Sequence, residues 1–160
     1  AAGKGEEGKA ALEAFDARAE KLGQELGDAL NEEISLVRFA SALTRIYYLD
    51  TFAGLILDQV GFARPAAQDK QEFADDVGKE RIPDFEGDRL FYFIYETGDG
   101  AAEAQAAEWT ADPLWQNLEV VKAGKAHAVD DAVWNTAGGY IAANLLLDDI
   151  ERIYGVPSTR

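Results

Sequence analysis

The charged side chain with the most informative position in the sequence is Arg38. It follows the apolar segment ISLV, which predicts a β-strand over residues 34–39. Side chains alternate along a strand, so Arg38 is expected on the same sheet face as Ile34 and Leu36. A charge is costly in mid-sheet, so the strand is predicted to end near Arg38, and strand ends form ligand crevices in open α/β sheets. The alternative is an arginine that extends to solvent or pairs with a nearby acid.

A second cluster, Arg45 with Tyr47 and Tyr48, follows closely. Arginine beside aromatic rings binds planar, anionic or oxygen-rich ligands, through forked hydrogen bonds and stacking. Strand alternation sends one of the adjacent tyrosines into the core. At most one of the two is therefore expected to contact a ligand.

Trp134 and His127 are two further candidates. Trp134 lies between a predicted strand and the last predicted helix, where it either caps a core or lines a pocket; general burial statistics favour the core. His127 is the only histidine, so no second imidazole shares a metal with it, and a structural role is predicted. The paired acids at 75–76, 130–131 and 148–149 are too common in so acidic a chain to indicate a glycosidase or a metal site.

The composition excludes several classes of function. The 160 residues include 30 acidic and 15 basic side chains, a net charge of −15 with no basic patch, which argues against nucleic-acid binding. The absence of cysteine excludes thiol catalysis, disulfides and thiolate metal sites. The longest apolar stretches, such as 90–95, fall far short of the roughly 20 residues that span a membrane. No phosphate loop, nucleophile elbow or zinc-ligand spacing occurs, so the case for an enzyme is weak.

The elements that position these residues follow from periodicity. A long amphipathic helix is predicted from an apolar stripe at Leu12, Phe15, Ala19, Leu22, Leu26 and Leu30. Gly23 and Gly27 lower its intrinsic stability, so it should depend on packing against another element. Further strands are predicted at 45–48, 90–95 and 126–129, helices at 52–60 (with Thr51 as N-cap and Gly61 at the end), 101–109 and 139–154, and a loop at 68–76. Alternating strands and helices predict an α/β architecture.

In this order, the motifs resemble the iron-siderophore family of periplasmic binding proteins, the class III solute-binding components of ABC importers. The similarity extends over nearly the whole chain from about residue 10. It is carried by SLVRF at 35–39, RIY at 45–47, TFAGLIL at 51–57, GFARP at 61–65, VGKE at 77–80, GDRLF at 87–91, PLWQNL at 113–118, VKAGK at 121–125, VDDAVW at 129–134 and LDDI at 147–150. Gly78 departs from the pattern, because the family commonly has serine there.

The resemblance implies a particular architecture. Members of the family have two α/β lobes joined by one long rigid helix, with the ligand in a shallow cleft between the lobes. Residues 1–31 would then be a tail and the connecting helix, and residues 32–160 the C-terminal ligand-binding lobe, with a mostly parallel central sheet flanked by helices. The N-terminal lobe would be missing, consistent with a processed or truncated chain that has no methionine. An extracytoplasmic location and a lipid anchor on the missing N-terminal part are also implied.

The resemblance also implies the roles of individual residues. Arg38, Arg45, Tyr47 and Trp134 would face the cleft and bind a ferric siderophore, and Glu80 would contact the permease of an ABC importer. No catalytic residue, cofactor or protein metal ligand is expected, because a siderophore already surrounds its iron with hard oxygen atoms. The net charge disfavours a tricatecholate unless the cleft is locally basic, and neutral or cationic hydroxamates fit more easily.

Three alternatives remain open from the sequence. Haem or cobalamin could replace the siderophore within the same family. A stand-alone interaction domain could bind a protein partner through the long helix. A small hydrolase could use one of the acid pairs, although no spacing supports it.

Overall fold

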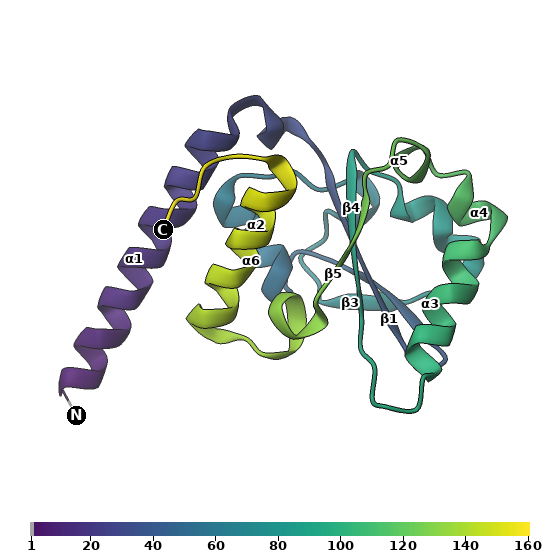
Figure 1. The fold of residues 1–160 in the computed structure, drawn as a ribbon, viewed down its shortest axis with the longest axis horizontal. Helices are drawn as coiled ribbons and strands as arrows, with labels where there is room; N and C mark the ends of the chain where they lie inside the picture. The colour runs from purple at the N-terminus through teal and green to yellow at the C-terminus, as the bar shows by residue number, and fades with distance from the viewer. Residues whose placement is uncertain (1) are drawn as a thin grey trace.

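The computed structural model describes residues 2–160, with side chains described from Gly5 onward. One five-stranded sheet lies between two groups of helices, with α1, α2 and α6 on one face and α3 and α4 on the other (Figure 1). The strands, in the order β3-β2-β1-β4-β5 across the sheet, are β3 Ala74–Asp76, β2 Leu43–Tyr47, β1 Ile34–Ala40, β4 Arg89–Ile94 and β5 Ala126–Val129. The helices are α1 Ala2–Leu26, α2 Phe52–Val60, α3 Ala101–Ala111, α4 Pro113–Gln116, α5 Glu119–Lys122 and α6 Gly139–Tyr154.

Four short helical turns complete the chain. Three are of the 3₁₀ type, η1 Gly27–Asn31, η2 Ala66–Gln68 and η3 Lys79–Phe85, and η4 Ala132–Thr136 is a π-helical turn. Over the described residues, no helix is long and apolar enough to cross a membrane.

The α/β architecture is confirmed, but the sheet is evenly mixed rather than mostly parallel. β1 pairs with β4 and β4 with β5 in parallel, whereas β1–β2 and β2–β3 are antiparallel. The physical reason lies at Ser41 and Ala42, because a two-residue connection can join only antiparallel strands. The loop predicted at 68–76 is wrong at its end, where residues 74–76 form the edge strand β3.

Several local predictions are confirmed by the structure. The Thr51 side chain accepts a hydrogen bond from the Gly54 backbone N–H at 3.0 Å, which caps α2 as expected. Gly61 ends that helix with φ of 115°, a conformation that favours glycine. The strand at 126–129 and the helix at 139–154 have the predicted bounds.

The long first helix packs against the lobe along its second half. Of the predicted stripe, Phe15, Ala19, Leu22 and Leu26 are buried, whereas Leu12 is 45% exposed. Gly23 allows the closest approach, since a β-carbon there would lie 2.7 Å from the Val60 carbonyl oxygen at the end of α2. The helix ends at Leu26, because Gly27 takes a positive φ, so Leu30 of the stripe lies in η1. The dependence of the helix on this packing, and the division into residues 1–31 and 32–160, stay predictions.

A buried arginine holds the same helix in place. Arg18 is 6% exposed, and its guanidinium donates to Asp148 at 2.6 Å and Glu151 at 2.9 Å on α6. Its other donors reach Asn144 and the Thr159 hydroxyl of the C-terminal segment. Arg18 therefore joins α1, α6 and the chain end, which lies beside α1 in Figure 1.

The central strand β1 depends on two buried polar side chains, Arg64 and Gln68. β2 pairs with β1 only from Val37 onward, and before that point the backbone neighbour is Ala63, whose carbonyl accepts from the Ile34 N–H at 2.9 Å. Arg64 donates to the Ile34 carbonyl at 2.7 Å and to the carbonyls of Tyr47 and Tyr48, where β2 diverges.

Gln68 makes further hydrogen bonds to the part of β1 that does not pair with β2. Its side-chain oxygen accepts from the Leu36 N–H at 3.0 Å and from Arg64 at 2.8 Å, and its nitrogen donates to the Ser35 hydroxyl at 2.7 Å. Burial lowers the pKa of Arg64 to about 10, so the guanidinium stays charged at neutral pH.

Arg64→Met should therefore destabilise the chain strongly. The substitution removes the Arg64 donor from the buried carbonyls of Ile34 and Tyr47, whereas the Tyr48 carbonyl keeps the Thr51 hydroxyl. We expect a loss of about 3 kcal/mol or more in the free energy of unfolding. The measurement is urea denaturation followed by circular dichroism. Arg152→Met is the matched control, because Arg152 is 70% exposed and should change stability by no more than about 0.5 kcal/mol. Equal losses in both variants would contradict the role of Arg64.

His127 is the second residue of β5 and lies near the end of the sheet at which β4 and β5 begin. Arg89 at the start of β4 contacts His127 Nε2 at 3.0 Å, donates to both Glu32 carboxylate oxygens, and lies 4.2 Å above the Tyr154 ring. Burial, and then the positive charge of Arg89, lower the pKa of His127 below its usual value.

Stability should consequently fall as His127 is protonated. Because its pKa is lower in the folded state, the favourable contribution is present above the unfolded-state value of about 6.5 and is lost as pH decreases below it. We expect the urea midpoint of the natural chain to fall more between pH 7 and pH 5 than that of His127→Gln, whose neutral amide oxygen still accepts from Arg89. Parallel pH profiles for the two proteins would show that His127 does not titrate in this way.

Candidate ligand-binding edge

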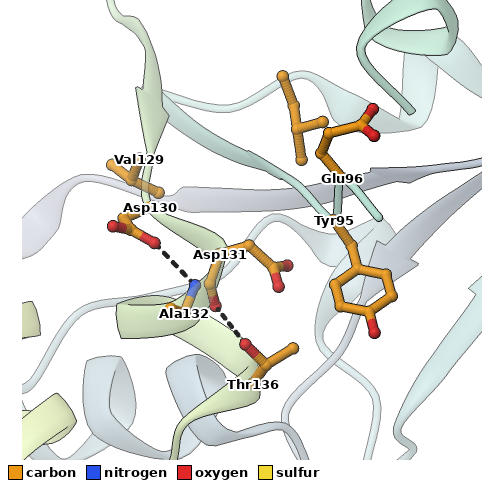
Figure 2. Close-up of a pocket in the computed structure, with 8 residues that line it drawn as sticks. Tyr95, Glu96, Val129, Asp130, Asp131, Ala132 and Thr136 are labelled. Atoms are coloured by element: carbon orange, nitrogen blue, oxygen red, sulfur yellow. Dashed lines mark hydrogen bonds between the residues drawn. The ribbon is translucent and has the colours of Figure 1, made fainter. Parts of the chain in front are cut away.

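The carboxyl ends of β1, β4 and β5 meet at one edge of the sheet, because these three strands are parallel. The residues that follow β4 and β5 border a pocket of about 360 Å³ there (Figure 2). The lining residues are Ile94, Tyr95, Glu96, Val129, Asp130, Asp131, Ala132 and Thr136. In open α/β sheets this is the edge at which ligands bind, so the pocket occupies the expected position for a site.

Arg38 lies near this edge and is held on two sides. Its Nε donates to Asp131 Oδ1 at 3.0 Å, and its guanidinium carbon lies 4.6 Å from the centre of the Tyr95 ring. Asn135 also accepts from this guanidinium at 3.2 Å when its amide oxygen faces it. Arg38 is 13% exposed and pairs with an acid, which is the second alternative from the sequence. The strand continues two residues beyond it, to Ala40, because the ion pair makes a charge tolerable between two paired strands.

Arg45 lies directly beside Arg38 on the neighbouring strand. The two residues are opposite partners in the β1–β2 register, so their side chains share one face of the sheet. Arg45 donates to Asp76 Oδ1 at 2.7 Å, and this ion pair is more exposed than that of Arg38. Like charges placed opposite each other are destabilising; here each arginine has its own carboxylate, which compensates for the repulsion.

These pairs form one row across the sheet. The register aligns Asp76 with Arg45, Arg45 with Arg38, Arg38 with Phe93, and Phe93 with Val129 at the pocket. Two guanidinium groups are therefore brought together on one sheet face near the candidate edge, and their contact with a ligand stays a prediction.

Tyr47 and Trp134 occupy buried positions. Tyr47 is 1% exposed and its ring lies 5.4 Å from those of Phe73 and Phe93. Trp134 is fully buried, lies 4.8 Å from the Phe91 ring, and donates its indole N–H to Asp149 at 2.8 Å. The structure does not place either ring in the pocket lining, and their ligand contacts stay a prediction.

Glu80 lies apart from the pocket, in the first turn of η3. Its side chain is exposed and folds over Gly78, so a β-carbon at position 78 would meet the carboxylate and displace it. The glycine therefore leaves the Glu80 carboxylate in a conformation that serine would change. Exposure is consistent with a docking role for Glu80, which stays a prediction.

Glu96 and Asp130 organise the two loops that frame the pocket. The Glu96 carboxylate accepts from the N–H groups of Gly98 at 2.6 Å and Gly100 at 2.9 Å; hydrogen bonds from the backbone, that of Gly100 first, lower its pKa. Asp130 accepts from the Ala132 N–H at 2.8 Å and so starts η4 (Figure 2). A single π-helical turn is frequent at functional sites.

The edge offers chemistry suited to binding. Guanidinium donors can hold carbonyl, hydroxamate or carboxylate oxygens, and the 43% exposed Tyr95 ring offers an apolar surface. Over the described residues, no group of three or more His, Cys, Asp or Glu side chains is arranged to hold a metal ion.

Two residues of this edge were not predicted as parts of the site, Tyr95 and Asp131. Asp131 belongs to an acid pair that is one of several in an acidic chain, and nothing local marks it as the partner of Arg38. The signal available was its position two residues after the end of β5, as Tyr95 directly follows β4.

Comparisons with known proteins agree with this geometry. The chain is 49% identical over 164 residues to a probable siderophore-binding lipoprotein, YfiY, of Bacillus subtilis, an alignment that covers 96% of this chain and 50% of that protein. It is 27% identical to the achromobactin-binding periplasmic protein of Dickeya dadantii, over 86% of this chain and 45% of that protein. The structure of Staphylococcus aureus SirA complexed with staphyloferrin B superposes with a TM-score of 0.88 at 28% identity, over 98% of this chain and 57% of SirA. No family model matches the sequence.

Over nearly its whole length, the chain resembles one half of siderophore-binding proteins. It spans about half the length of the curated relatives it matches, and its fold corresponds to a single lobe of these class III binding proteins. The resemblance inferred from the motifs is thereby confirmed.

Within this lobe, the two arginine–carboxylate pairs should differ in their effect on stability. Asp131→Ala leaves the largely buried Arg38 without its carboxylate, and we expect a loss of about 2–4 kcal/mol in the free energy of unfolding. Asp76→Ala removes an acid that is 61% exposed and should cost less than about 1 kcal/mol. Urea denaturation of both variants measures the difference; equal costs would contradict the stronger burial of the Arg38 pair.

Proposed function

We propose that this lobe forms one wall of a cleft that binds a ferric siderophore, and that the complete protein captures the complex and delivers it to an ABC importer. The observation that carries the proposal is the pair of adjacent arginines, Arg38 and Arg45, at the carboxyl edge of the sheet. This edge belongs to a lobe 49% identical to half of a probable siderophore-binding lipoprotein. The relatives are named as binding proteins, which supports binding without catalysis.

The iron is cargo in this proposal, held by the siderophore rather than by the protein. In this proposal, guanidinium groups donate hydrogen bonds to the oxygen atoms around the ferric centre. A guanidinium has five N–H donors, and Asp131 and Asp76 each accept from one of them, the Nε of Arg38 and of Arg45. Arg45 is the more accessible donor because it is 34% exposed, whereas Arg38 lies deeper.

In this proposal, the buried rings of Tyr47 and Trp134 pack against elements that position the site. Tyr47 packs on Phe93 in the row next to Arg38, and Trp134 fixes η4 against α6 through Asp149. A change at either position would shift the residues that border the pocket.

The remaining parts of the proposal concern location and partner. The family relatives are named as a lipoprotein and a periplasmic protein, which supports an extracytoplasmic, membrane-anchored location for the complete protein. Glu80, exposed at the start of η3, is the proposed contact of this lobe with the permease.

Binding should be tested on the complete two-lobed protein by tryptophan fluorescence. We expect at least one complex from a panel of ferric hydroxamate, catecholate and citrate-type siderophores to quench the emission, with haem and cobalamin tested in parallel. Arg38→Ala should weaken binding by about 10- to 100-fold, because a charge-assisted hydrogen bond and its positioning are lost.

Arg152→Ala, which removes an exposed guanidinium from the end of α6, should leave the affinity unchanged. If no ferric siderophore bound, the proposed function would be wrong. If Arg38→Ala bound as tightly as the natural protein, Arg38 would have no place in the site.

A further inference from the structure

The pocket at the ligand edge has an unusual charge for a site built on arginines. Its lining contains three carboxylates, on Glu96, Asp130 and Asp131, and over the described residues no lysine or arginine is part of that lining. Arg38 and Arg45 lie in the row across the sheet that ends at Val129 of the lining, and each is paired with a carboxylate. Two guanidinium groups thus face four carboxylates, counting Asp76.

Among the described residues, no lysine or arginine forms an ion pair with Glu96 or Asp130. Asp131 and Asp76, in contrast, each pair with an arginine. Glu96 is held by backbone N–H groups of the following turn, which favour its ionised form and carry no net charge. Asp130 is exposed and accepts from the Ala132 N–H. The edge consequently carries about two negative charges in excess where a ligand would lie.

We propose that this lobe selects ferric siderophores that carry no net negative charge, of the hydroxamate class, over anionic complexes. The inference rests on the proposed function and adds the ligand's charge to it. The arginine pair supplies hydrogen bonds to oxygen atoms, whereas Glu96 and Asp130 set the electrostatic potential and repel a complex with anionic groups on its surface.

The magnitude follows from Coulomb's law. Two excess charges at roughly 10 Å from a ligand in water change its binding by about fourfold for each unit of ligand charge at low ionic strength. A change of two units, from a cationic to an anionic complex, should therefore alter the affinity by about 16-fold without screening, and by about tenfold in a dilute buffer in which the Debye length is about 30 Å. Added salt should reduce this ratio, because the Debye length falls to about 10 Å at 0.1 M.

The test uses three ferric complexes with the same iron-binding groups and different charge. Ferrioxamine B carries a free ammonium group, its N-acetyl derivative is neutral at that position, and its N-succinyl derivative carries a carboxylate. Dissociation constants for the complete two-lobed protein are measured by fluorescence quenching at low and at high salt. We expect the ammonium form to bind about tenfold more tightly than the carboxylate form at low salt.

A double variant isolates the contribution of this wall. Glu96→Gln with Asp130→Asn removes both excess charges and should reduce the tenfold ratio to about one, and Asp130→Asn alone, which retains an acceptor for the Ala132 N–H, should give about threefold. The matched control is Glu33→Gln with Glu119→Gln, which removes two carboxylates from the pocket at the opposite edge of the sheet and should leave the ratio unchanged.

The outcomes separate this inference from the proposed function. The charge preference is overturned if the carboxylate form binds as tightly as the ammonium form, or if the Glu96 and Asp130 variants leave the ratio unchanged. It is also overturned if all three ferrioxamines fail to bind while a ferric catecholate or citrate-type complex binds, and in that case the proposed function stands. If no ferric siderophore of any class binds, the proposed function itself is wrong.

Discussion

The lobe depends on one constraint, which is that the central strand must be completed where its neighbour is too short. β1 extends from Ile34, but β2 pairs with it only from Val37. An unpaired backbone in the interior costs free energy comparable to a lost hydrogen bond at each group. Arg64 and Gln68, which lie in the segment between α2 and β3, remove that cost. Their side chains form hydrogen bonds with the backbone of both β1 and β2.

This arrangement explains how β1, a strand that stays in the core, holds Arg38 near the candidate edge. Its first half is fixed by Arg64 and Gln68 on one side and by β4 on the other. Its second half pairs with β2, whose opposite residue to Arg38 is Arg45. The hairpin register therefore decides that two guanidinium groups lie side by side, and the acids that compensate them come from the ends of β3 and β5.

What could be predicted from the sequence was largely what is encoded locally. The Thr51 cap, the Gly61 stop and the strand at 126–129 each follow from a few adjacent residues. β3 was not predicted because Ala74–Asp76 has no apolar pattern, and only its pairing with β2 makes it a strand. The partner of Arg38 was not predicted either, because Asp131 is 93 residues away and the ion pair depends on the strand order. Gln68 was assigned to a loop, and its full burial follows from the gap beside β1.

The two edges of the sheet use arginine in different ways, and the difference separates stability from binding. At the amino-terminal edge, Arg89 bonds to both oxygens of Glu32, contacts His127 and covers the Tyr154 ring, so nearly all of its polar surface has a partner within the lobe. At the carboxyl edge, Arg45 is engaged by Asp76 on its Nε side and is 34% exposed. An arginine whose N–H donors are all hydrogen-bonded within the lobe must lose such a bond before it can bind a ligand. An arginine with accessible donors can bind a ligand without losing any. Because Arg89 lies at the start of β4 and Arg45 lies on β2 beside the second half of β1, the two kinds of arginine are at opposite ends of the sheet. The candidate edge can therefore vary in charge while the other end maintains the lobe.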